Sequence, residues 1–249
     1  MNHTRIVAII PSRLESSRLP RKALTDICGL PMIVHVFKRC EFAKSLDELF
    51  VATDSDEICQ IVEQHGGKVL MTSSHHKNGT ERIYEGLQKL KMTNVDHIIS
   101  LQGDEPEINP EDIKNLYNNM IKNNSDMGTL AAEIKEDSML YNKNIVKVKT
   151  QEKLKNNNFV LAIDFSRDNF SKQSLNVYHH IGIYCYKTST LKKFINLKQT
   201  KNEIKSRLEQ LRAMDNNINI NVALAKSSPI GVDTKEDYVA FKKIMEYKS

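Results

Sequence analysis

Hydrophobic positions in the first half of the chain form short apolar runs separated by segments with helical periodicity. The runs lie at residues 6–10, 49–53, 68–71 and 96–101, and their length and continuity are typical of strands covered on both faces of a sheet. Between the second and third runs, Ile58, Ile61, Val62 and His65 keep the i, i+3, i+4, i+7 spacing of an amphipathic helix. This alternation predicts a parallel sheet with helices on both faces.

Capping and breaking residues set the expected limits of these elements. Pro11 is expected to end the first strand, and Gly29-Leu-Pro31 to open a helix with Ile33, Val36, Phe37 and Cys40 inward. Thr53-Asp-Ser55 should cap the next helix and Gly66-Gly67 should stop it. Asn109 should cap a helix whose buried face is Ile113, Leu116, Tyr117 and Met120.

The pattern becomes irregular beyond about Asp126, which suggests a smaller mixed lobe. Strands are expected at 127–134, 145–149, 159–163 and 177–186, with helices early in the lobe and at 187–196. An amphipathic helix at 203–212 should turn Ile204, Leu208 and Leu211 inward, and a last strand at 218–224 should lead to a closing helix with Tyr238, Phe241 and Met245 inside. We expect a single domain, 1–249, with a core of about 1–125 and 218–249 and an inserted lobe of about 126–217.

Composition narrows the class of protein. Hydrophobic residues make up 40% and charged residues 27% of the 249 positions, which argues against disorder, and no apolar stretch approaches the ~20 residues of a membrane helix. The first strand begins at Arg5 or Ile6, which leaves no room for a signal peptide, so we expect a cytoplasmic protein without membrane insertion. The four cysteines form no CxxC pair, which suits reduced core thiols better than a zinc site or a disulfide framework.

The mild positive charge favours an anionic small substrate. The net charge of +5 comes from lysines spread over the whole chain, and tryptophan is absent. A nucleic-acid module would show a basic face with interleaved aromatic residues. A non-catalytic basic module for RNA or an acidic partner remains the alternative from another class, and it predicts tight RNA binding with a steep salt dependence.

A cationic loop follows the first strand. Arg13, Arg18, Arg21 and Lys22 fall within ten residues, at the carboxyl end of a strand, where open α/β sheets place their ligands. Four neighbouring cations repel one another, and a polyanion such as a phosphate chain offsets this cost. The alternative is an ordinary solvated basic loop.

Two aspartates are candidate ligands of a metal ion. Asp104 follows a buried strand and Gly103, and a carboxylate there is costly unless it binds a cation or a hydrogen-bond donor. Asp233 follows the last expected strand. Mg²⁺ prefers carboxylate oxygens and completes its shell with waters and phosphates. The alternative is capping, which suits Thr234 and Asp237 better than Asp233. His75 and His76 could also suggest a metal pair, but adjacent histidines do not easily share one ion.

Several segments resemble the signature of sugar-activating cytidylyltransferases, especially the CMP-Kdo synthetase family. Gln102-Gly-Asp-Glu-Pro106 matches that family without change, and the other matching segments are 11–13, 17–22, 79–82, 144–148, 165–167, 180–184, 208–212 and 231–237. The departures are Ser12, Arg21, Asn78, Ser206, Lys235 and the segment 168–171. The resemblance covers nearly the whole chain.

The resemblance implies a Rossmann-like nucleotide-diphospho-sugar transferase fold of the α/β class, GT-A-like, with a mixed sheet and a smaller lobe for sugar binding and dimerisation. It implies catalytic roles for Arg13, Lys22, Asp104 and Asp233, with Mg²⁺ as cofactor on the two aspartates. The implied nucleotide-binding residues are Pro11, Ser12, Arg13, Lys22, Arg82 and Gln102; the implied sugar-binding residues are Gln102, Lys147, Arg167, His180, Tyr184, Glu209 and Gln210. Taken alone, Lys147 and Arg167 could be solvated surface cations, His180 a satisfied core histidine, and Glu209 and Arg212 an ordinary i,i+3 pair.

The activity implied by the resemblance is transfer of CMP from CTP to 3-deoxy-manno-octulosonate (Kdo), with release of diphosphate, for lipopolysaccharide biosynthesis by a homodimer. No nucleic-acid partner is expected. The departures at 168–171 and Ser206 leave the sugar less secure than the nucleotide, because they fall in segments expected to line the sugar pocket. An 8-amino analogue of Kdo or a nonulosonate is therefore the alternative substrate.

Overall fold

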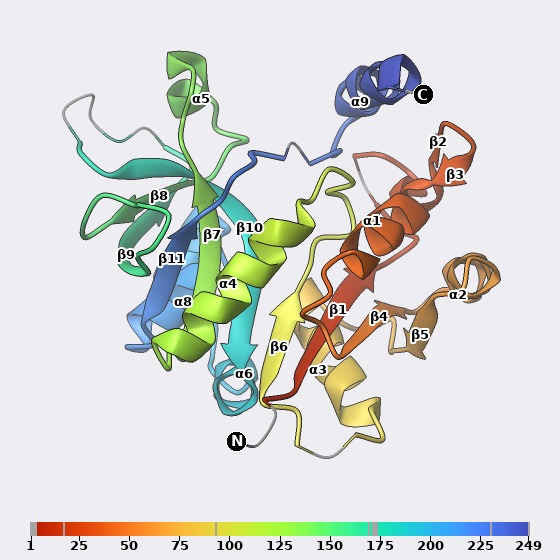
Figure 1. Cartoon of the computed structure of the whole chain (residues 1–249), viewed down its shortest axis with the longest axis horizontal. Helices are drawn as coiled ribbons and strands as arrows, with labels where there is room; N and C mark the ends of the chain where they lie inside the picture. The colour runs from red at the N-terminus through yellow and green to blue at the C-terminus, as the bar shows by residue number, and fades with distance from the viewer. Residues whose placement is uncertain are drawn as a thin grey trace. The chain divides into compact units, whose positions relative to one another are not determined.

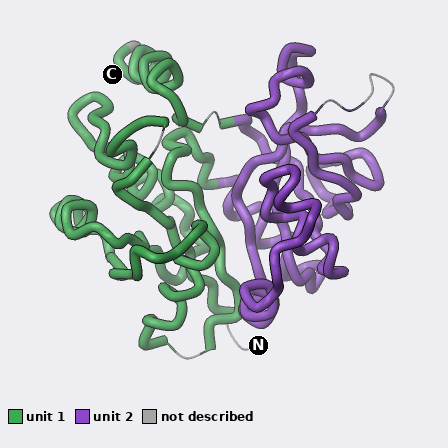
Figure 2. The backbone as a smooth tube through the Cα atoms, turned by 180° about the vertical axis from the view of Figure 1, so that it is seen from behind, with its two compact units in different colours: residues 1–110, 229–249 green, residues 111–228 purple. Residues whose placement is uncertain are grey.

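The structure is a computed structural model that describes residues 4–16, 18–92, 94–168, 170, 174–229 and 231–248. It divides into two compact units (Figure 2): unit 1 comprises residues 1–110 and 229–249, and unit 2 comprises residues 111–228. Unit 2 therefore begins and ends at different residues from the lobe expected at 126–217, and the single-domain organisation stays a prediction. Among the described residues no helix is long and apolar enough to cross a membrane.

The sheet of unit 1 is parallel, as predicted. Its strands lie in the order β5 (Lys68–Met71), β4 (Glu48–Thr53), β1 (Ile6–Ser12) and β6 (His97–Ser100), and all three pairings are parallel (Figure 1). Residues 6–10 of β1 are all fully buried, because β1 is central and covered on both faces. The carboxyl ends of β1 and β6 therefore meet at one edge of this sheet.

Pro11 does not end the first strand. It continues β1 by pairing with Ala52 of β4, and Ser12 pairs with Thr53. The carbonyl of Ile9 accepts from Leu101 N on the β6 side, and Pro11, two residues on, faces that same side. The pairing with β6 ends at Ile9 and Ser100. The missing N–H of the proline thus falls where the ladder requires no donor.

The helices of unit 1 cover both faces of its sheet. α1 (Met32–Glu41) lies on the face of Ile10, and α3 (Gly79–Lys89) lies on the face of Ile9, where a Cβ on Gly86 would stand 3.5 Å from Ile9 Cδ1. α2 (Asp56–Gln64) is capped by Ser55, whose hydroxyl accepts from Ile58 N. The closing helix α9 (Lys235–Lys248) packs Phe241, Tyr238 and Met245 against Ile27 and Met32. These helix faces confirm the predictions.

The loop between β1 and α1 contains two small elements that the sequence pattern did not indicate. A short 3-10 helix, η1 (Lys22–Leu24), follows Arg21, which adopts a left-handed conformation with φ of 55°. A hairpin of β2 (Asp26–Ile27) and β3 (Leu30–Pro31) turns at Cys28 and Gly29, which both have positive φ. Glycine would adopt the conformation of Arg21 without strain.

Unit 2 carries a mixed set of strands. These are β7 (Met127–Ala132), β8 (Lys147–Thr150), β9 (Val160–Ser166), β10 (Val177–Lys187) and β11 (Ile220–Leu224). Their order is β10-β7-β11-β9-β8, and a further pairing of β8 with β10 returns to the first strand. Among the described residues of unit 2, β7 and β11 pair in parallel and the other pairings of these strands are antiparallel.

Helices pack on this second set of strands. α4 (Pro110–Lys122) buries Ile113, Leu116, Tyr117 and Met120, as predicted. α5 (Asp137–Tyr141) and α6 (Thr188–Ile195) are the two helices expected within the lobe. All four cysteines are free thiols, but the prediction of core positions holds only for Cys40 and Cys185, because Cys28 is exposed and Cys59 is partly exposed.

The single helix predicted at 203–212 is wrong. The segment forms two short helices, α7 (Lys201–Ser206) and α8 (Gln210–Asp215), because Arg207 adopts a left-handed conformation with φ of 53° and ends α7. Leu208 and Leu211 are buried as expected, but the break turns Ile204 outward, and 61% of Ile204 is exposed.

Candidate active site

A cavity of about 310 Å³ opens in unit 1 at the carboxyl ends of β1 and β6. Strand β1 supplies Pro11 and Ser12, the loop after it supplies Arg13, Arg18 and Lys22, and the loop after β6 supplies Gln102 to Asp104. All the predicted catalytic and nucleotide-binding residues line it: Pro11, Ser12, Arg13, Lys22, Arg82, Gln102, Asp104 and Asp233. Gly103 packs closely against the backbone of β1. A Cβ at this position would lie only 3.0 Å from the Pro11 carbonyl oxygen.

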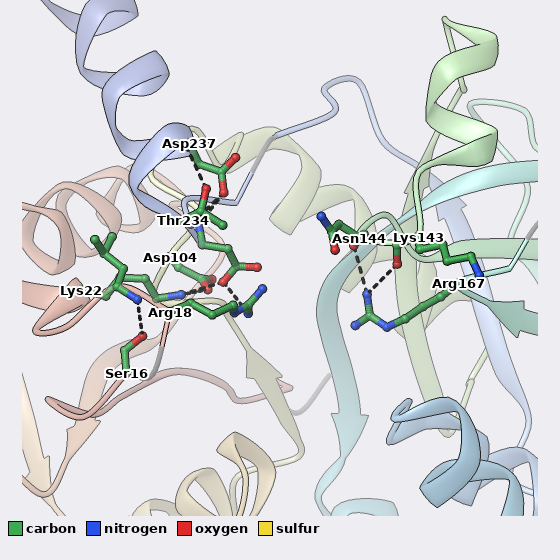
Figure 3. A network of polar contacts seen from close by, with 11 residues as sticks. Ser16, Arg18, Lys22, Asp104, Lys143, Asn144, Arg167, Thr234 and Asp237 are labelled. Atoms are coloured by element: carbon green, nitrogen blue, oxygen red, sulfur yellow. Dashed lines mark hydrogen bonds and ion pairs between the residues drawn. The ribbon is translucent and has the colours of Figure 1, made fainter.

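One ammonium group joins the two aspartates (Figure 3). Lys22 Nζ lies 2.6 Å from Asp104 Oδ2 and 2.9 Å from Asp233 Oδ1. Arg18 donates a further hydrogen bond, of 2.9 Å, to the same oxygen of Asp233. Burial lowers the pKa of Lys22, but the two carboxylates outweigh this effect and hold the pKa above its usual value. Lys22 is therefore a fixed positive charge in the cavity wall.

Local backbone bonds place Asp233 beside Asp104. Val232 N donates to the Asp104 carbonyl oxygen at 2.9 Å. Thr234 and Asp237 form the predicted capping pair, in which Asp237 N donates to Thr234 Oγ1 and Thr234 N donates to Asp237 Oδ2. The same Asp237 oxygen accepts from Asp233 N, so the start of α9 fixes the backbone of Asp233 and leaves its carboxylate for the cavity.

The two aspartates fit a magnesium ion. Their carboxylates converge on one cationic atom, Lys22 Nζ, and both offer the oxygen donors that Mg²⁺ prefers. The described part of the chain holds no cluster of three or more His, Cys, Asp or Glu side chains suited to a metal. An ion on Asp104 and Asp233 would thus complete its shell with waters and substrate oxygens, as Mg²⁺ commonly does.

A third acid, Glu105, lies next to this pair. Its Oε2 is buried and has no hydrogen-bond partner among the described residues. Burial, together with the charges of Asp104 and Asp233, raises the pKa of Glu105 to about 8. Nothing in the sequence singles out Glu105, because its unusual environment forms only in the folded chain.

Two predicted cations have structural partners. Arg82 is only 4% exposed and donates to Thr72 Oγ1 at 2.6 Å and to Asp54 Oδ2 at 3.0 Å, although it still lines the cavity. Arg21, from the cationic loop, pairs instead with Glu57 of α2 and does not line the cavity. Three cations of the loop, Arg13, Arg18 and Lys22, thus line the cavity, whereas the fourth binds a helix outside it.

The structure places His76, Lys77 and Asn78 in the cavity wall as well. Their position in the polar loop before Gly79-Thr-Glu-Arg82 was the available signal, because that loop should follow β5 to the same sheet edge. Asn78 caps α3 by accepting from Glu81 N at 2.8 Å. His75 is exposed and does not line the cavity.

In unit 2, Lys147 and Arg167 bind the backbone of one loop. Lys147 is fully buried, and its Nζ donates to the carbonyl oxygens of Asn142 (3.1 Å), Ile145 (3.0 Å) and Arg167 (2.6 Å). Arg167 Nη1 donates to the carbonyls of Lys143 and Asn144 (Figure 3). The interpretation of Lys147 as a solvated surface cation is wrong, because burial of the ammonium is offset by three backbone acceptors. A sugar contact by either residue stays a prediction.

His180 lies in the core of unit 2. Its Nε2 is 3.0 Å from Thr129 Oγ1, and its ring packs edge-on against Phe165. Thr129 Oγ1 also lies 2.7 Å from the Ile183 carbonyl, so the hydroxyl donates there and accepts from the histidine. Burial, then the charges of His179 and Arg167, lower the pKa of His180 to about 3. These contacts agree with the core-histidine interpretation, and a sugar contact stays a prediction.

The remaining predicted sugar-binding residues lie around the α7–α8 break. Glu203 and Arg212 form a buried pair with two hydrogen bonds, and Arg212 lies 3.6 Å from Glu209 Oε1. Gln210 is buried at the start of α8. The Tyr184 hydroxyl is buried without a hydrogen-bond partner among the described residues, and burial raises the pKa of Tyr184. A polar ligand would supply the partner that this hydroxyl lacks.

Three residues of the resembling segments lie outside the described residues: Ser17, Asn169 and Ser171. The neighbouring Asp168 is described, and 81% of its side chain is exposed beside Lys143, at 3.6 Å.

Known proteins similar to this chain share both its sequence and its fold. A model of the family described as cytidylyltransferase matches residues 7–220. The 3-deoxy-manno-octulosonate cytidylyltransferases of Brucella ovis and Brucella abortus (strain 2308) are each 40% identical over 232 residues, which is 93% of this chain and 92% of theirs.

Solved structures agree. The structure of CMP:2-keto-3-deoxy-manno-octonic acid synthetase complexed with CTP matches with a TM-score of 0.89 and 33% identity, over 98% of this chain and 100% of that one. A 4-diphosphocytidyl-2C-methyl-D-erythritol synthase from Anaerococcus prevotii, 16% identical with a TM-score of 0.63 over 97% of this chain and 98% of its own, shares the fold alone. The chain therefore belongs to the 3-deoxy-manno-octulosonate cytidylyltransferase family.

Proposed function

We propose that this protein activates Kdo: CTP and 3-deoxy-manno-octulosonate give CMP-Kdo and diphosphate. The observation that carries the proposal is the unit 1 cavity, where Lys22 stands between Asp104 and Asp233 and Arg13 lines the same wall. The names of the Brucella relatives and of the CTP-bound structure supply the substrates.

In this proposal the residues of unit 1 bind and neutralise the nucleotide. The anomeric hydroxyl of the sugar attacks the α-phosphorus, and negative charge grows on the α-phosphate and on the departing diphosphate. Arg13 and Lys22 stabilise that charge, so catalysis depends on positioning and electrostatics rather than on a protein nucleophile. Asp104 and Asp233 would hold Mg²⁺, which when bound lowers the pKa of a coordinated hydroxyl and neutralises phosphate oxygens.

The sugar acid is assigned to side chains of unit 2. Arg167 offers a planar cation suited to a carboxylate, and the unpartnered Tyr184 hydroxyl and the amide of Gln210 suit sugar hydroxyls. Lys147 and His180 already have partners in the scaffold, and we expect them to orient this wall. Gln102 of unit 1 completes the proposed set.

Three further parts of the proposal rest on resemblance to the family: a homodimer, a cytoplasmic location and a role in lipopolysaccharide biosynthesis. Analytical ultracentrifugation tests the first, and cell fractionation tests the second.

The test of the activity is release of diphosphate from CTP and Kdo in the presence of Mg²⁺, with ATP, GTP and UTP as controls. We expect turnover with CTP, and loss of turnover when a chelator removes Mg²⁺. Diphosphate release that does not depend on Kdo, or tight RNA binding without any turnover, would contradict the proposal.

A further inference from the structure

The positive charge of the chain is concentrated in one segment of unit 2. Residues 187–207 contain seven lysines and arginines but a single acid, Glu203. This excess of six positive charges is larger than the net charge of +5 of the whole chain. Lysines occur throughout the sequence, but outside this segment acidic residues compensate for the basic ones.

The acid of this segment does not neutralise its lysines. Glu203 is buried in α7 and accepts two hydrogen bonds from Arg212. The guanidinium of Arg212 also lies over the ring of Phe194 in α6, 5.0 Å from the ring centroid. Both α6 and α7 therefore pack against the same buried guanidinium, which balances the charge of Glu203 inside unit 2.

The cations of these two helices and of the turns after them are exposed. Leu191 and Phe194 of α6 and Glu203 of α7 face the interior, and the basic residues lie at the positions between them. We call six exposed residues the basic patch: Lys192, Lys193, Lys198, Lys201, Lys205 and Arg207. None of the six forms an ion pair with an acid in the described part of the chain.

Three acids lie beside the segment and reduce its charge only in part. Asp126 pairs with Lys187 at 2.9 Å, and Lys187 is not counted in the basic patch. Asp215 of α8 accepts a hydrogen bond of 2.9 Å from α7, and Glu209 lies 3.6 Å from Arg212. When Asp215 and Glu209 are set against the six cations of the patch, an excess of four positive charges remains.

Two features of the basic patch are unfavourable in the free protein. Lys201 and Lys205 are spaced i,i+4 in α7, and like charges at this spacing destabilise a helix. Ile204, three residues after Lys201 and adjacent to Lys205, is 61% exposed. A partner that is anionic and has an apolar layer beneath its charges would offset both features.

The side chains present favour a lipid surface over a nucleic acid. Phe194 is the single aromatic residue of segment 187–207 and is only 1% exposed, so the segment offers no ring on which a base could stack. Ile204 suits the boundary between headgroups and acyl chains, where lysines beside it reach the phosphates. Clusters of four to eight basic residues on a helix are typical of segments that bind anionic lipids.

We propose that the basic patch of unit 2 binds the surface of an anionic lipid bilayer. The six cations face the lipid phosphates and Ile204 enters the headgroup region, while α6 and α7 lie on the bilayer without crossing it. The inference is independent of the activity proposed above, because it rests on residues outside the unit 1 cavity.

Flotation of the full chain with lipid vesicles tests the proposal. We expect binding to vesicles of phosphatidylglycerol and phosphatidylcholine in equal parts, no binding to phosphatidylcholine alone, and release at ~0.5 M salt, where exposed charges are screened. Lys201→Gln/Lys205→Gln should weaken binding to the anionic vesicles at least ~5-fold. Lys192→Gln/Lys193→Gln, which changes the other helix, should give a loss of similar size.

The matched control is Lys153→Gln/Lys155→Gln, which removes the same charge from another exposed segment of unit 2. It should stay within about twofold of the parent, because the patch and not the net charge provides the attraction. Absence of binding to the anionic vesicles, or an equal loss in this control, would overturn the proposal.

A change that keeps the charge separates a bilayer from other polyanions. Ile204→Gln should weaken vesicle binding at least ~3-fold, because it removes the apolar contact with the headgroup region. The same variant should bind poly(U) as weakly as the parent does. Unchanged vesicle binding by Ile204→Gln, or binding of the parent to poly(U) as tight as to the vesicles, would overturn the lipid assignment. Diphosphate release is measured separately, so failure of the proposed activity and failure of vesicle binding are distinguishable.

Discussion

In the proposed function, Lys22 takes part in both nucleotide binding and catalysis. In the free protein its ammonium satisfies two carboxylates that would otherwise repel each other across the cavity. In the proposed function a triphosphate would compete for the same ammonium, and Asp104 and Asp233 would be the residues that hold Mg²⁺. These ion pairs thus hold Asp104 and Asp233 in place when no substrate is bound, and neither carboxylate lacks a partner.

The acid pair gives the first prediction. Asp104→Asn and Asp233→Asn should each lower turnover by at least ~100-fold, the scale of a lost transition-state stabiliser. Thermal stability should change little, because both carboxylates are partly exposed and Lys22 retains one of them. Asp126→Asn, which removes a surface partner of Lys187, is the control. Near-normal turnover of either variant at limiting Mg²⁺ would exclude that residue as a metal ligand.

His180 gives a prediction about pH. Its pKa is about 3 in the fold and about 6.5 in an unfolded chain, so the unfolded state binds the extra proton between these values. Stability is therefore complete above about pH 6.5 and falls as the pH drops, by about 2 kcal/mol between pH 7 and pH 5. In urea titrations, His180→Gln should reduce this pH-dependent loss by a similar amount, whereas the exposed control His75→Gln should keep it. An unchanged slope in His180→Gln would show that the imidazole is not buried in its neutral form.

At the scale of elements, the sequence correctly predicted the helices for which the hydrophobic periodicity and the capping residues indicate the same limits. The Ser55 and Asn78 caps and the inner faces of α4 and α9 were predictable, because each depends on residues within one or two turns. The break at Arg207 was not, because a non-glycine residue in the left-handed region carries no local signal. The prediction that Pro11 ends the first strand was wrong for a related reason: whether a proline fits in β1 depends on where the pairing with β6 ends.

The candidate site likewise contains residues that could be predicted from the sequence and residues that could not. Asp104, Asp233 and the cationic loop were predictable as strand-end residues, and the cavity of unit 1 brings together the two aspartates and all the cations of that loop except Arg21. The partners of buried groups were not fully predictable, since part of the environment of Lys147 and of Glu105 comes from residues far along the chain, Arg167 and Asp233 respectively. From the sequence alone a lysine is expected to be a surface cation, and a buried position becomes apparent only when the carbonyl groups around its ammonium are known.

Lys147 gives the prediction at this scale. Lys147 and Arg167 together donate hydrogen bonds to the four successive carbonyls of residues 142–145, and Lys147 also donates to the carbonyl of Arg167. Lys147→Met should leave buried carbonyls unpaired and destabilise the protein by about 2–4 kcal/mol. It should also raise KM for the sugar acid by at least ~10-fold, through displacement of Arg167, with little change in CTP affinity.

The control for this loop is Lys149→Met, two residues further along β8, whose side chain is only half-buried. It should be close to neutral in urea unfolding and in sugar kinetics. If Lys147→Met were as stable as this control, or if it weakened CTP and sugar equally, the role of Lys147 in orienting Arg167 would be wrong.

For the whole molecule, the nucleotide side is closer to the family pattern than the sugar side. Each motif of unit 1 contributes a residue to one cavity, and the departures at Ser12 and Asn78 place small polar side chains there. The departures in the sugar segments include Asp168 and Ser206, of which Asp168 adds a carboxylate. Discrimination among nucleotides should therefore follow the family, and CTP should be strongly preferred over ATP and GTP.

The last prediction concerns the choice of sugar. A carboxylate at Asp168 would favour an amino-substituted sugar only if it faced the ligand, but 81% of its side chain is exposed and its neighbour is Lys143. A carboxylate so exposed and beside a lysine gives little binding energy to an amino group. We therefore expect plain Kdo as the substrate, and Asp168→Ala should change neither specificity constant by more than about twofold. Measured kcat/KM values for Kdo and 8-amino-Kdo decide the matter: a preference above ~10-fold for the amino sugar, about 1.4 kcal/mol, that disappears in Asp168→Ala would show that this carboxylate selects the substrate.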